Sequence, residues 1–589
     1  MKKTTISNFA KGAILSVILI MGNSCKLEDD LVNPSSLTTD QAGNEFIFNG
    51  LQLNMAGFFI TATQFGMDNT RMLAMFGATY ENAYTANSFN ALWFSAYSDI
   101  MVNANLLLEK TAEDPATPEL EYNAFYQGTS KVMKAYVLMT MVDYFGDIPY
   151  SQAFNTLDFN APVDSGEDVY QDALALLDDA IADFDLVDAT TVKPTKDQFY
   201  NADEALWRKL AKTLKFKFYL QTRLVTDVAS EAAMDALLLE GDMISDRSED
   251  FVFRSFGNSQ SNPNTYHPWF YGNYLTSANQ YMSNSYMKEL FDAKSYVDDG
   301  TPVTIRDPRV RFYFYRQTTS PTTDVNELTC SSATSPPPHY PAGTAYCQLP
   351  NGYWGRDHLN FEGTPPDGLR RTIYGLYPAG GAFDASQGVG VDELEPAHLG
   401  AGAKGKGIVP IMLYSYVLFM QAEYELVMKS DPVAANATMM AAIDESIGKV
   451  IAFDPSVLPT SGAVLNTFNP TAISNYKAAV QLRYDAGYET DYFPGGTPVA
   501  ANATADEKLD VLIHEYWVAL WGNGVEAYNT VRRTGKPGNL QPALALNPGQ
   551  FYRSFTYPAV FVIRNSSATQ KPDNTVKVFW DTNPAGFVK

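Results

Sequence analysis

The feature that most constrains the fold is an apolar segment, residues 119–154, that ends in an abrupt turn. Its apolar side chains recur every three or four residues, which is typical of one buried face of a helix. Residues 132–145 include only two charged side chains, so this part of the helix is expected to be buried on most sides. Gly146 is placed to end the helix and Pro149 prevents it from resuming. The segment predicts the central helix of a mainly helical core.

Further amphipathic helices are predicted on both sides of this segment, and they suggest helix pairs stacked as in tetratricopeptide arrays. No strict 34-residue repeat is visible. The predicted helices span about 44–60, 88–110, 119–145, 167–184, 204–225, 409–429, 434–453 and 505–531. Between about 226 and 404, helical periodicity weakens and Gly, Pro, Asn and aromatic residues dominate. We expect a large loop-rich region with few short strands there.

The N-terminal residues are typical of a lipoprotein signal peptide. Basic residues precede a short apolar run, residues 13–21, which is followed by Gly-Asn-Ser and then Cys25. The run is too short to span a bilayer, and a cysteine after small residues resembles a bacterial lipoprotein cleavage site. We therefore predict a signal peptide over 1–24, lipidation of Cys25 and a lipidated tether over 25–43. The acidic cluster at residues 26–30 resembles a signal for export to the outward face of the outer membrane, and a solvated linker is the alternative.

The other two cysteines, Cys330 and Cys347, lie close together in a loop rich in Pro, Ser and Thr. If Cys25 carries lipid, these two form an even pair in an exported protein. A disulfide between them is therefore predicted for an oxidising compartment. Two unrelated free thiols are the alternative.

Several function classes find no support in the sequence. The formal net charge of -24 argues against a nucleic-acid binder, which needs basic surface to neutralise phosphates. The five histidines are scattered without ligand spacing, so neither a metal site nor a cofactor is predicted. Residues 400–407 nearly match a phosphate-binding loop, but Gly407 replaces the Ser or Thr that would hold magnesium. No catalytic residue is assigned, although acidic pairs of the glycosidase type are defined only by their separation in space.

The densest aromatic and amide stretch, residues 262–274, is the candidate binding face. Tyr266, Trp269, Tyr271 and Tyr274 are predicted to contact ligand, because they lie in a Pro- and Asn-rich loop rather than on a periodic helix. Fewer of these rings should then be needed for the core. The alternative is that the cluster packs the loop onto the helical scaffold.

Several stretches, taken in order along nearly the whole chain, resemble the SusD/RagB family of nutrient-binding outer-membrane lipoproteins. They are Tyr-Phe-Gly-Asp-Ile-Pro-Tyr-Ser-Gln-Ala-Phe at 144–154, Asp-Pro-Arg at 307–309, and the stretches 355–368, 377–384, 418–423, 526–535 and 579–581. The resemblance implies that these motifs are mostly structural. Gly146 and Pro149 would shape a turn, and Arg532 and Arg533 are expected to pair with buried acids.

The resemblance also implies a fold, a location and a partner. The expected fold is mainly α, with tetratricopeptide-like helix pairs supporting a loop-rich ligand region in one SusD-like domain over 44–589. Its helical scaffold would occupy about 44–225, 409–453 and 505–535, its ligand region about 226–404, and irregular chain 454–504 and 536–589.

The implied function is that of an outer-membrane lipoprotein, facing the cell exterior, that is not an enzyme. It would bind an oligosaccharide and deliver it to a TonB-dependent transporter of the SusC/RagA type. Alternatives are a peptide-binding lid of such a transporter and a surface glycoside hydrolase.

Overall fold

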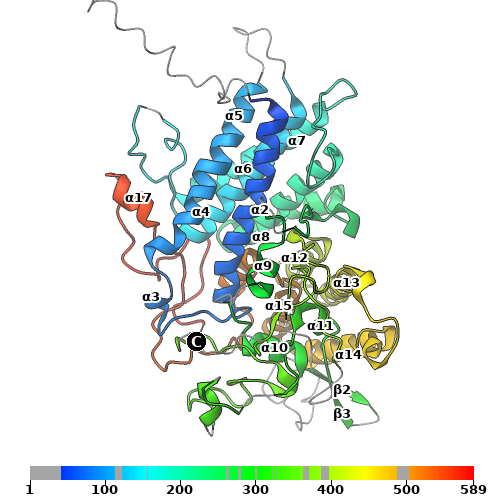
Figure 1. Cartoon of the computed structure of the whole chain (residues 1–589). Coiled ribbons are helices and arrows are strands. Elements are labelled where there is room, and N and C mark those ends of the chain that lie inside the picture. The colour runs from blue at the N-terminus through cyan, green and yellow to red at the C-terminus, as the bar shows by residue number, and fades with distance from the viewer. Residues whose placement is uncertain are drawn as a thin grey trace, which may run out of the picture.

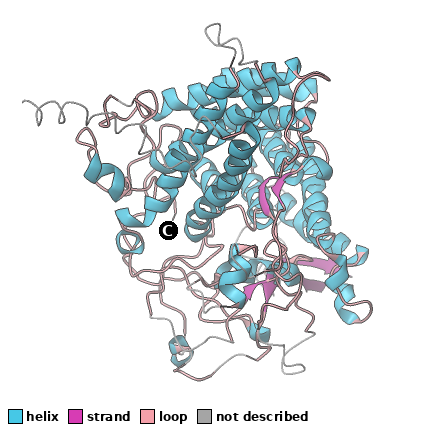
Figure 2. Cartoon of the chain, turned by 45° about the horizontal axis from the view of Figure 1, so that its top comes forward, coloured by secondary structure: helices cyan, strands magenta, loops and turns pink. Residues whose placement is uncertain are grey.

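The computed structural model describes residues 42–112, 122–155, 157–259, 264–275, 280–292, 294–298, 301–320, 323–326, 328–333, 335–362, 370–386, 397–486 and 503–588. Within these residues the chain is mainly helical and has a few short strands, which confirms the predicted fold class. Figure 2 shows most of the long helices gathered in one part of the molecule, and long loops with short helices and strands in the other. One large hydrophobic core extends through both parts.

The N-terminal scaffold consists of helices that pack side by side in sequence order, α5 on α6, α6 on α7 and α7 on α8 (Figure 1). Its elements are α2 (Asn44–Asn69), α3 (Tyr80–Ala83), η1 (Ala86–Phe89), α4 (Asn90–Phe94), η2 (Ser95–Met101), α5 (Val102–Lys110), α6 (Ala124–Phe145), α7 (Gly166–Leu186) and α8 (Glu204–Glu240). Two predicted helices were too short. The helix predicted over 44–60 continues to Asn69, and the one predicted over 204–225 continues past a kink at Thr226.

The middle of the chain holds short helices and three two-stranded antiparallel sheets, β1 with β6, β2 with β3 and β4 with β5. Its elements are η3 (Arg247–Glu249), β1 (Phe251–Phe253), α9 (Pro268–Tyr274), α10 (Asn284–Phe291), β2 (Lys294–Asp298), β3 (Thr301–Ile305), α11 (Val310–Tyr313), β4 (Phe314–Tyr315), η4 (Thr329–Ser332), η5 (Pro350–Gly352), β5 (Ile373–Tyr374) and β6 (Val409–Met412). The prediction that the helix over 409–429 begins at its first residue was wrong. Residues 409–412 are the strand β6, and its partner β1 is distant in sequence.

The C-terminal part returns to helices. They are α12 (Tyr414–Val427), α13 (Pro432–Ile451), η6 (Pro455–Val457), η7 (Ala463–Thr467), α14 (Pro470–Ala486), α15 (Ala505–Ala519), α16 (Gly524–Thr534) and α17 (Ala559–Arg564). The single helix predicted over 505–531 is two helices, because the chain turns at Gly522 with a φ of 96°. The region 454–504, predicted to be irregular, contains α14.

The central helix is present as predicted, with Lys131 its only residue that is not buried. It ends at Gly146, whose φ of 71° lies in the left-handed region that favours glycine. Near this end, the fully buried Asp143 accepts hydrogen bonds from the Tyr170 hydroxyl at 2.6 Å, Asn529 Nδ2 at 2.6 Å and Trp580 Nε1 at 3.0 Å. One carboxylate therefore joins α6 to α7, to α16 and to the C-terminal tail.

The two arginines expected to pair with buried acids differ from each other. Arg533 pairs with Glu423, with Nη2 at 2.7 Å from Oε2, as predicted. The prediction was wrong for Arg532, which donates to the carbonyl oxygen of Arg553 at 2.7 Å and to Asn529 Oδ1 at 2.8 Å. Its guanidinium also lies 3.8 Å from the ring centroid of Tyr528, so an aromatic face takes the place of an acid.

Candidate functional site

Three of the four aromatic residues predicted to bind ligand do not lie in a loop, whereas Tyr266 lies in the irregular chain just before α9. Trp269, Tyr271 and Tyr274 belong to α9, which starts at Pro268 and is capped by the His267 ring, whose Nδ1 accepts from the backbone N–H of Trp269. Proline at the first position and a side-chain cap are common at helix starts. The prediction missed this helix because seven residues are too few to show a clear helical period.

Trp269 and Tyr274 are core residues, each only 4% exposed. The Trp269 ring stacks on Tyr374, with centroids 5.1 Å apart and planes at 10°. The Tyr274 hydroxyl donates to the backbone oxygen of Tyr374 at 2.7 Å. The expectation that these two rings were spared from the core was therefore wrong, because α9 packs directly on β5.

Tyr266 and Tyr271 are only partly buried, and their rings stack with centroids 6.2 Å apart. Contact of these two rings with a ligand stays a prediction.

A different set of polar and aromatic side chains lies where three segments distant in sequence meet. Leu73 and Met282 form an antiparallel bridge, and Ser283 and Arg356 form a parallel one. The backbone N–H of Leu359 donates to the oxygen of Met75 at 3.0 Å. Backbone pairing thus brings the end of α2, the start of α10 and the loop after η5 to one place.

A glycine makes this close pairing possible. A Cβ atom on Gly355 would lie 2.0 Å from the backbone oxygen of Met282, which any larger side chain would have to displace. The backbone N–H of Gly355 instead donates to Asn284 Oδ1 at 3.0 Å. The three segments are therefore held together by short contacts that tolerate little change.

We call a set of side chains from these segments, three of them exposed and three buried, the aromatic platform. Its members are Phe76, Tyr281, Arg356, Asn360, Phe361 and Glu362. Arg356 is at its centre, because its guanidinium lies 4.1 Å from the ring centroid of Tyr281 and 5.8 Å from that of Phe76. Arg356 Nη1 also donates to the backbone oxygen of Glu362 at 2.5 Å. Contacts of this kind between a cation and aromatic faces hold the guanidinium in a fixed position.

The platform exposes two phenylalanine rings. Phe76 is 50% exposed and Phe361 is 59% exposed. Among the described residues, the other aromatic rings with comparable exposure lie in the N-terminal scaffold and its turns; they are Phe46, Phe94, Tyr122 and Phe159. Exposed rings of this kind can stack on the apolar face of a sugar. The exposed carboxylate of Glu362 can accept hydrogen bonds from sugar hydroxyls, whereas Arg356 and Asn360 are buried.

A disulfide fastens the chain beside the platform. Cys330 and Cys347 are joined, as predicted, with Cα atoms 5.6 Å apart. The backbone oxygen of Cys347 accepts from Asn284 Nδ2 at 3.0 Å, and its N–H donates to Asp357 Oδ2 at 3.0 Å. The hollow next to the disulfide has a volume of only about 10 Å³, enough for about one water molecule. A ligand of the platform would therefore bind on its surface.

Sequence reasoning missed Phe76 and Phe361 as candidate contacts. Phe361 lies within the stretch 355–368 that carried the family resemblance, but the motif does not say which side chains reach solvent. Phe76 has no local signal, since its exposure follows from where the chain leaves α2 and meets the other two segments.

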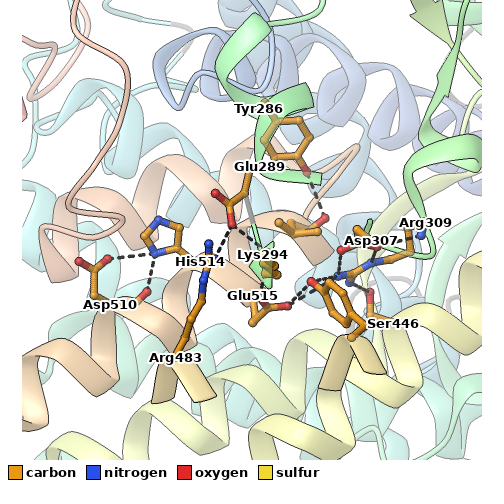
Figure 3. A network of polar contacts seen from close by, with 12 residues as sticks. Tyr286, Glu289, Lys294, Asp307, Arg309, Ser446, Arg483, Asp510, His514 and Glu515 are labelled. Carbon is orange, nitrogen blue, oxygen red and sulfur yellow. Dashed lines mark hydrogen bonds and ion pairs between the residues drawn. The ribbon is translucent and has the colours of Figure 1, made fainter. Parts of the chain in front are cut away.

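A network of buried charged residues lies elsewhere in the fold (Figure 3). Lys294 Nζ lies 2.8 Å from Glu289 Oε1 and 3.2 Å from Glu515 Oε1. Arg309 pairs with Asp307, with Nη2 at 2.6 Å from Oδ2. The Asp-Pro-Arg motif therefore supplies a buried ion pair. Arg309 Nη1 also donates to the Ser446 hydroxyl at 2.8 Å, which links the chain before α11 to α13.

The ionisation of this network follows from its pairing. Burial by itself would raise the pKa of Glu289, but Lys294 and Arg483 hold that pKa well below its usual range. Burial would likewise lower the pKa of His514, yet Asp510 raises it above its ordinary value. The carboxylates of Glu289, Asp307 and Glu515 are at most 6% exposed, so these acids stabilise the fold and do not face a substrate.

Among the described residues, no group of three or more His, Cys, Asp or Glu side chains is arranged to hold a metal ion. No helix in the described part of the chain is long and apolar enough to cross a membrane.

The chain resembles known proteins at the level of family and fold. The model of a family described as "Starch-binding associating with outer membrane" (SusD-like) matches residues 35–330. Among curated proteins, no match was found.

Two solved structures illustrate the similarity of fold. A SusD/RagB family protein from Bacteroides thetaiotaomicron is 17% identical, with a TM-score of 0.62 over 92% of this chain and 100% of that one. A chitin-binding SusD homologue from Flavobacterium johnsoniae is 18% identical, with a TM-score of 0.60 over 91% of this chain and 99% of that one.

Proposed function

Since the chain belongs to the SusD-like family, we propose that it binds oligosaccharides at the outer membrane and delivers them to a TonB-dependent transporter of the SusC/RagA type. The aromatic platform is the observation that carries the binding role, because it exposes two rings and the carboxylate of Glu362 around the buried guanidinium of Arg356. The family is described as starch-binding, and one structural relative is described as chitin-binding. Both descriptions support a glycan rather than a peptide as ligand.

The proposed role requires binding without catalysis. The platform holds one carboxylate, Glu362, which accepts a hydrogen bond from the Thr329 hydroxyl. A glycosidase of the common kind uses two carboxyl groups on either side of the scissile bond. The neighbouring carboxylate, Asp357, is buried and accepts hydrogen bonds from Asn284, Gln541 and the backbone N–H of Cys347.

Replacing both Phe76 and Phe361 by alanine is expected to weaken glycan binding about hundredfold. A ring that covers about 50 Å² of apolar sugar surface contributes about 1.3 kcal/mol at 25 cal/mol per Å², which is about tenfold in affinity. Isothermal titration with a panel of chitin-, starch- and xylan-derived oligosaccharides would measure the change. Thermal unfolding should change little, because exposed side chains contribute roughly 0.5 kcal/mol or less.

Phe46 provides a matched control, since it is 68% exposed on α2 and outside the platform. Phe46→Ala should bind glycans as the wild type does. The platform assignment would be wrong if the double variant bound as tightly as the wild type. Binding of peptides but of no glycan would favour the peptide-binding alternative, and release of shorter sugars from the panel would favour the hydrolase.

The membrane anchor is proposed at Cys25, which lies outside the described residues. Two or three acyl chains on this cysteine would anchor the protein stably, whereas a single chain binds membranes only marginally. Export to the outward face of the outer membrane would then place the platform where external glycans arrive.

Replacing Cys25 by alanine is expected to leave the protein unprocessed or soluble, since no thiol remains to accept lipid. Cell fractionation, with mass spectrometry of the N-terminus, would measure this in a host that processes lipoproteins. The double variant Cys330→Ser, Cys347→Ser keeps Cys25 and should still partition into the outer membrane. Normal partitioning of Cys25→Ala would rule out this anchor.

A further inference from the structure

A cavity of about 480 Å³ lies away from the aromatic platform, between η3, the end of β1, the lead into β6 and the C-terminal end of α13. This volume falls within the range of about 300–1,000 Å³ that is usual for ligand pockets. Its chemistry is unusual for a chain of net charge -24, because it is lined by four cationic side chains, Arg247, Arg254, Lys406 and Lys449.

Two of these cations have carboxylate partners. Arg247 Nη2 lies 2.9 Å from Glu445 Oε2, and Lys449 pairs with Asp250. For Arg254 and Lys406, the described structure shows neither an ion pair within 4 Å nor a side-chain hydrogen bond, and both are exposed to solvent. These two side chains therefore retain donors for a ligand.

The carboxylate that lines the cavity, Asp454, is engaged in local hydrogen bonds. Asp454 Oδ1 accepts from the backbone N–H of Ser456 at 3.1 Å and from its hydroxyl at 2.5 Å. The cations also act on one another, since burial and the charges of Arg254 and Arg247 lower the pKa of Lys449 despite its pairing with Asp250. An anion in the cavity would offset this repulsion.

The cavity wall includes an aromatic ring and aliphatic surface. Phe453 is partly exposed and packs edge-on against Tyr377, with centroids 5.5 Å apart and planes at 88°. Ile408 also lines the cavity. A ring at the wall of a cationic pocket suits a ligand that carries both an apolar face and a negative group.

The segment 400–407, whose sequence nearly matches a phosphate-binding loop, contributes Lys406 to this cavity. In the structure it is a series of turns that leads into β6. A nucleotide loop instead joins a strand to the start of a helix, whose N-terminal N–H groups hold the phosphates. The segment therefore supplies a cation without the architecture of a nucleotide site.

We propose that this cavity binds the carboxylate or sulfate group of an acidic saccharide, with Arg254 and Lys406 donating to the anion and Phe453 against the sugar ring. The inference rests on the proposed glycan-binding function and narrows its ligand class to acidic glycans. The aromatic wall favours a sugar-borne anion over a free inorganic one, which would gain nothing from the ring.

The test compares wild type with the double variant Arg254→Gln, Lys406→Gln by isothermal titration at low and high salt. The probes are tetragalacturonate, a sulfated chondroitin tetrasaccharide, neutral chitotetraose and sodium sulfate. At least one acidic saccharide is expected to bind the wild type, more weakly at high salt. The double variant should bind it at least about tenfold more weakly, since hydrogen bonds to charged groups are the stronger ones.

Lys404→Gln is the matched control, because this exposed lysine lies in the same segment and does not line the cavity. It should bind the acidic probe as the wild type does. The inference would be overturned if no acidic saccharide bound the wild type, if the double variant bound it unchanged, or if Lys404→Gln lost as much. Equal affinity for sodium sulfate and the acidic saccharides would also overturn it.

The two proposals fail in different ways. Chitotetraose, or another neutral oligosaccharide that binds the platform, should bind the double variant as it binds the wild type, because the platform is intact. If a neutral glycan binds but the cavity variants change nothing, only the acidic-ligand inference fails. If no glycan of either charge binds the wild type, the glycan-binding function fails as well.

Discussion

Replacing Trp269 by alanine is expected to lower the free energy of unfolding by about 3–5 kcal/mol, the usual cost of removing a large aromatic side chain from a core. Its indole is 4% exposed, stacks on the ring of Tyr374 at 5.1 Å and packs against the tilted ring of His267 at 5.0 Å. Loss of the ring would leave a cavity where α9 packs on β5. Guanidinium denaturation of the two proteins would measure the difference.

Tyr271→Ala is the control from the same helix. This ring is partly exposed, so its removal should lower the free energy of unfolding by roughly 1 kcal/mol or less. A stable Trp269→Ala variant with weakened glycan binding would contradict the core role and restore the ligand role predicted for this residue. A less stable variant whose residual folded fraction binds glycan normally would support the core role.

Replacing Glu423 by glutamine is also expected to lower the free energy of unfolding by about 3–5 kcal/mol, because removing one partner leaves buried charges uncompensated. Glu423 is fully buried between Arg533, at 2.7 Å, and Arg223, at 3.1 Å. Burial alone would raise the pKa of Glu423, but the two arginines hold that pKa below its usual value. The carboxylate is therefore ionised in the folded protein, and glutamine would leave both guanidinium groups without a counter-charge.

Glu231→Gln offers a contrast from the surface. Glu231 pairs with Lys429 at 2.9 Å, but both side chains are more than one-third exposed. Exposed pairs of this kind contribute roughly 0–1 kcal/mol, so this variant should unfold nearly as the wild type does. Similar losses for the two variants would show that burial does not set the cost of losing Glu423.

The features that could be predicted from the sequence are those that depend on local residue patterns. The helix α6 was evident because its apolar side chains repeat with the period of the helix, and because Gly146 and Pro149 end it by their own backbone geometry. The disulfide between Cys330 and Cys347 followed from the small number of cysteines and their proximity in the chain. The whole-chain order of motifs indicated the SusD-like family, which the family match and the fold confirm.

The candidate sites depend on contacts that no local pattern encodes. The platform exists because backbone pairing brings residues 73, 282 and 356 together, and the sequence spacing between them carries no signal of this. The cavity likewise gathers cations from η3, the end of β1, the lead into β6 and α13.

The aromatic stretch 262–274 also separates what the sequence predicts from what tertiary contacts decide. Its composition alone indicated an ordered segment whose aromatic rings pack or stack. Whether a ring meets solvent or core depends on what covers it, and β5, about a hundred residues later, covers Trp269. Residue type and period therefore determined the helices, whereas exposure, and with it the binding surface, was decided only by the tertiary contacts of distant segments.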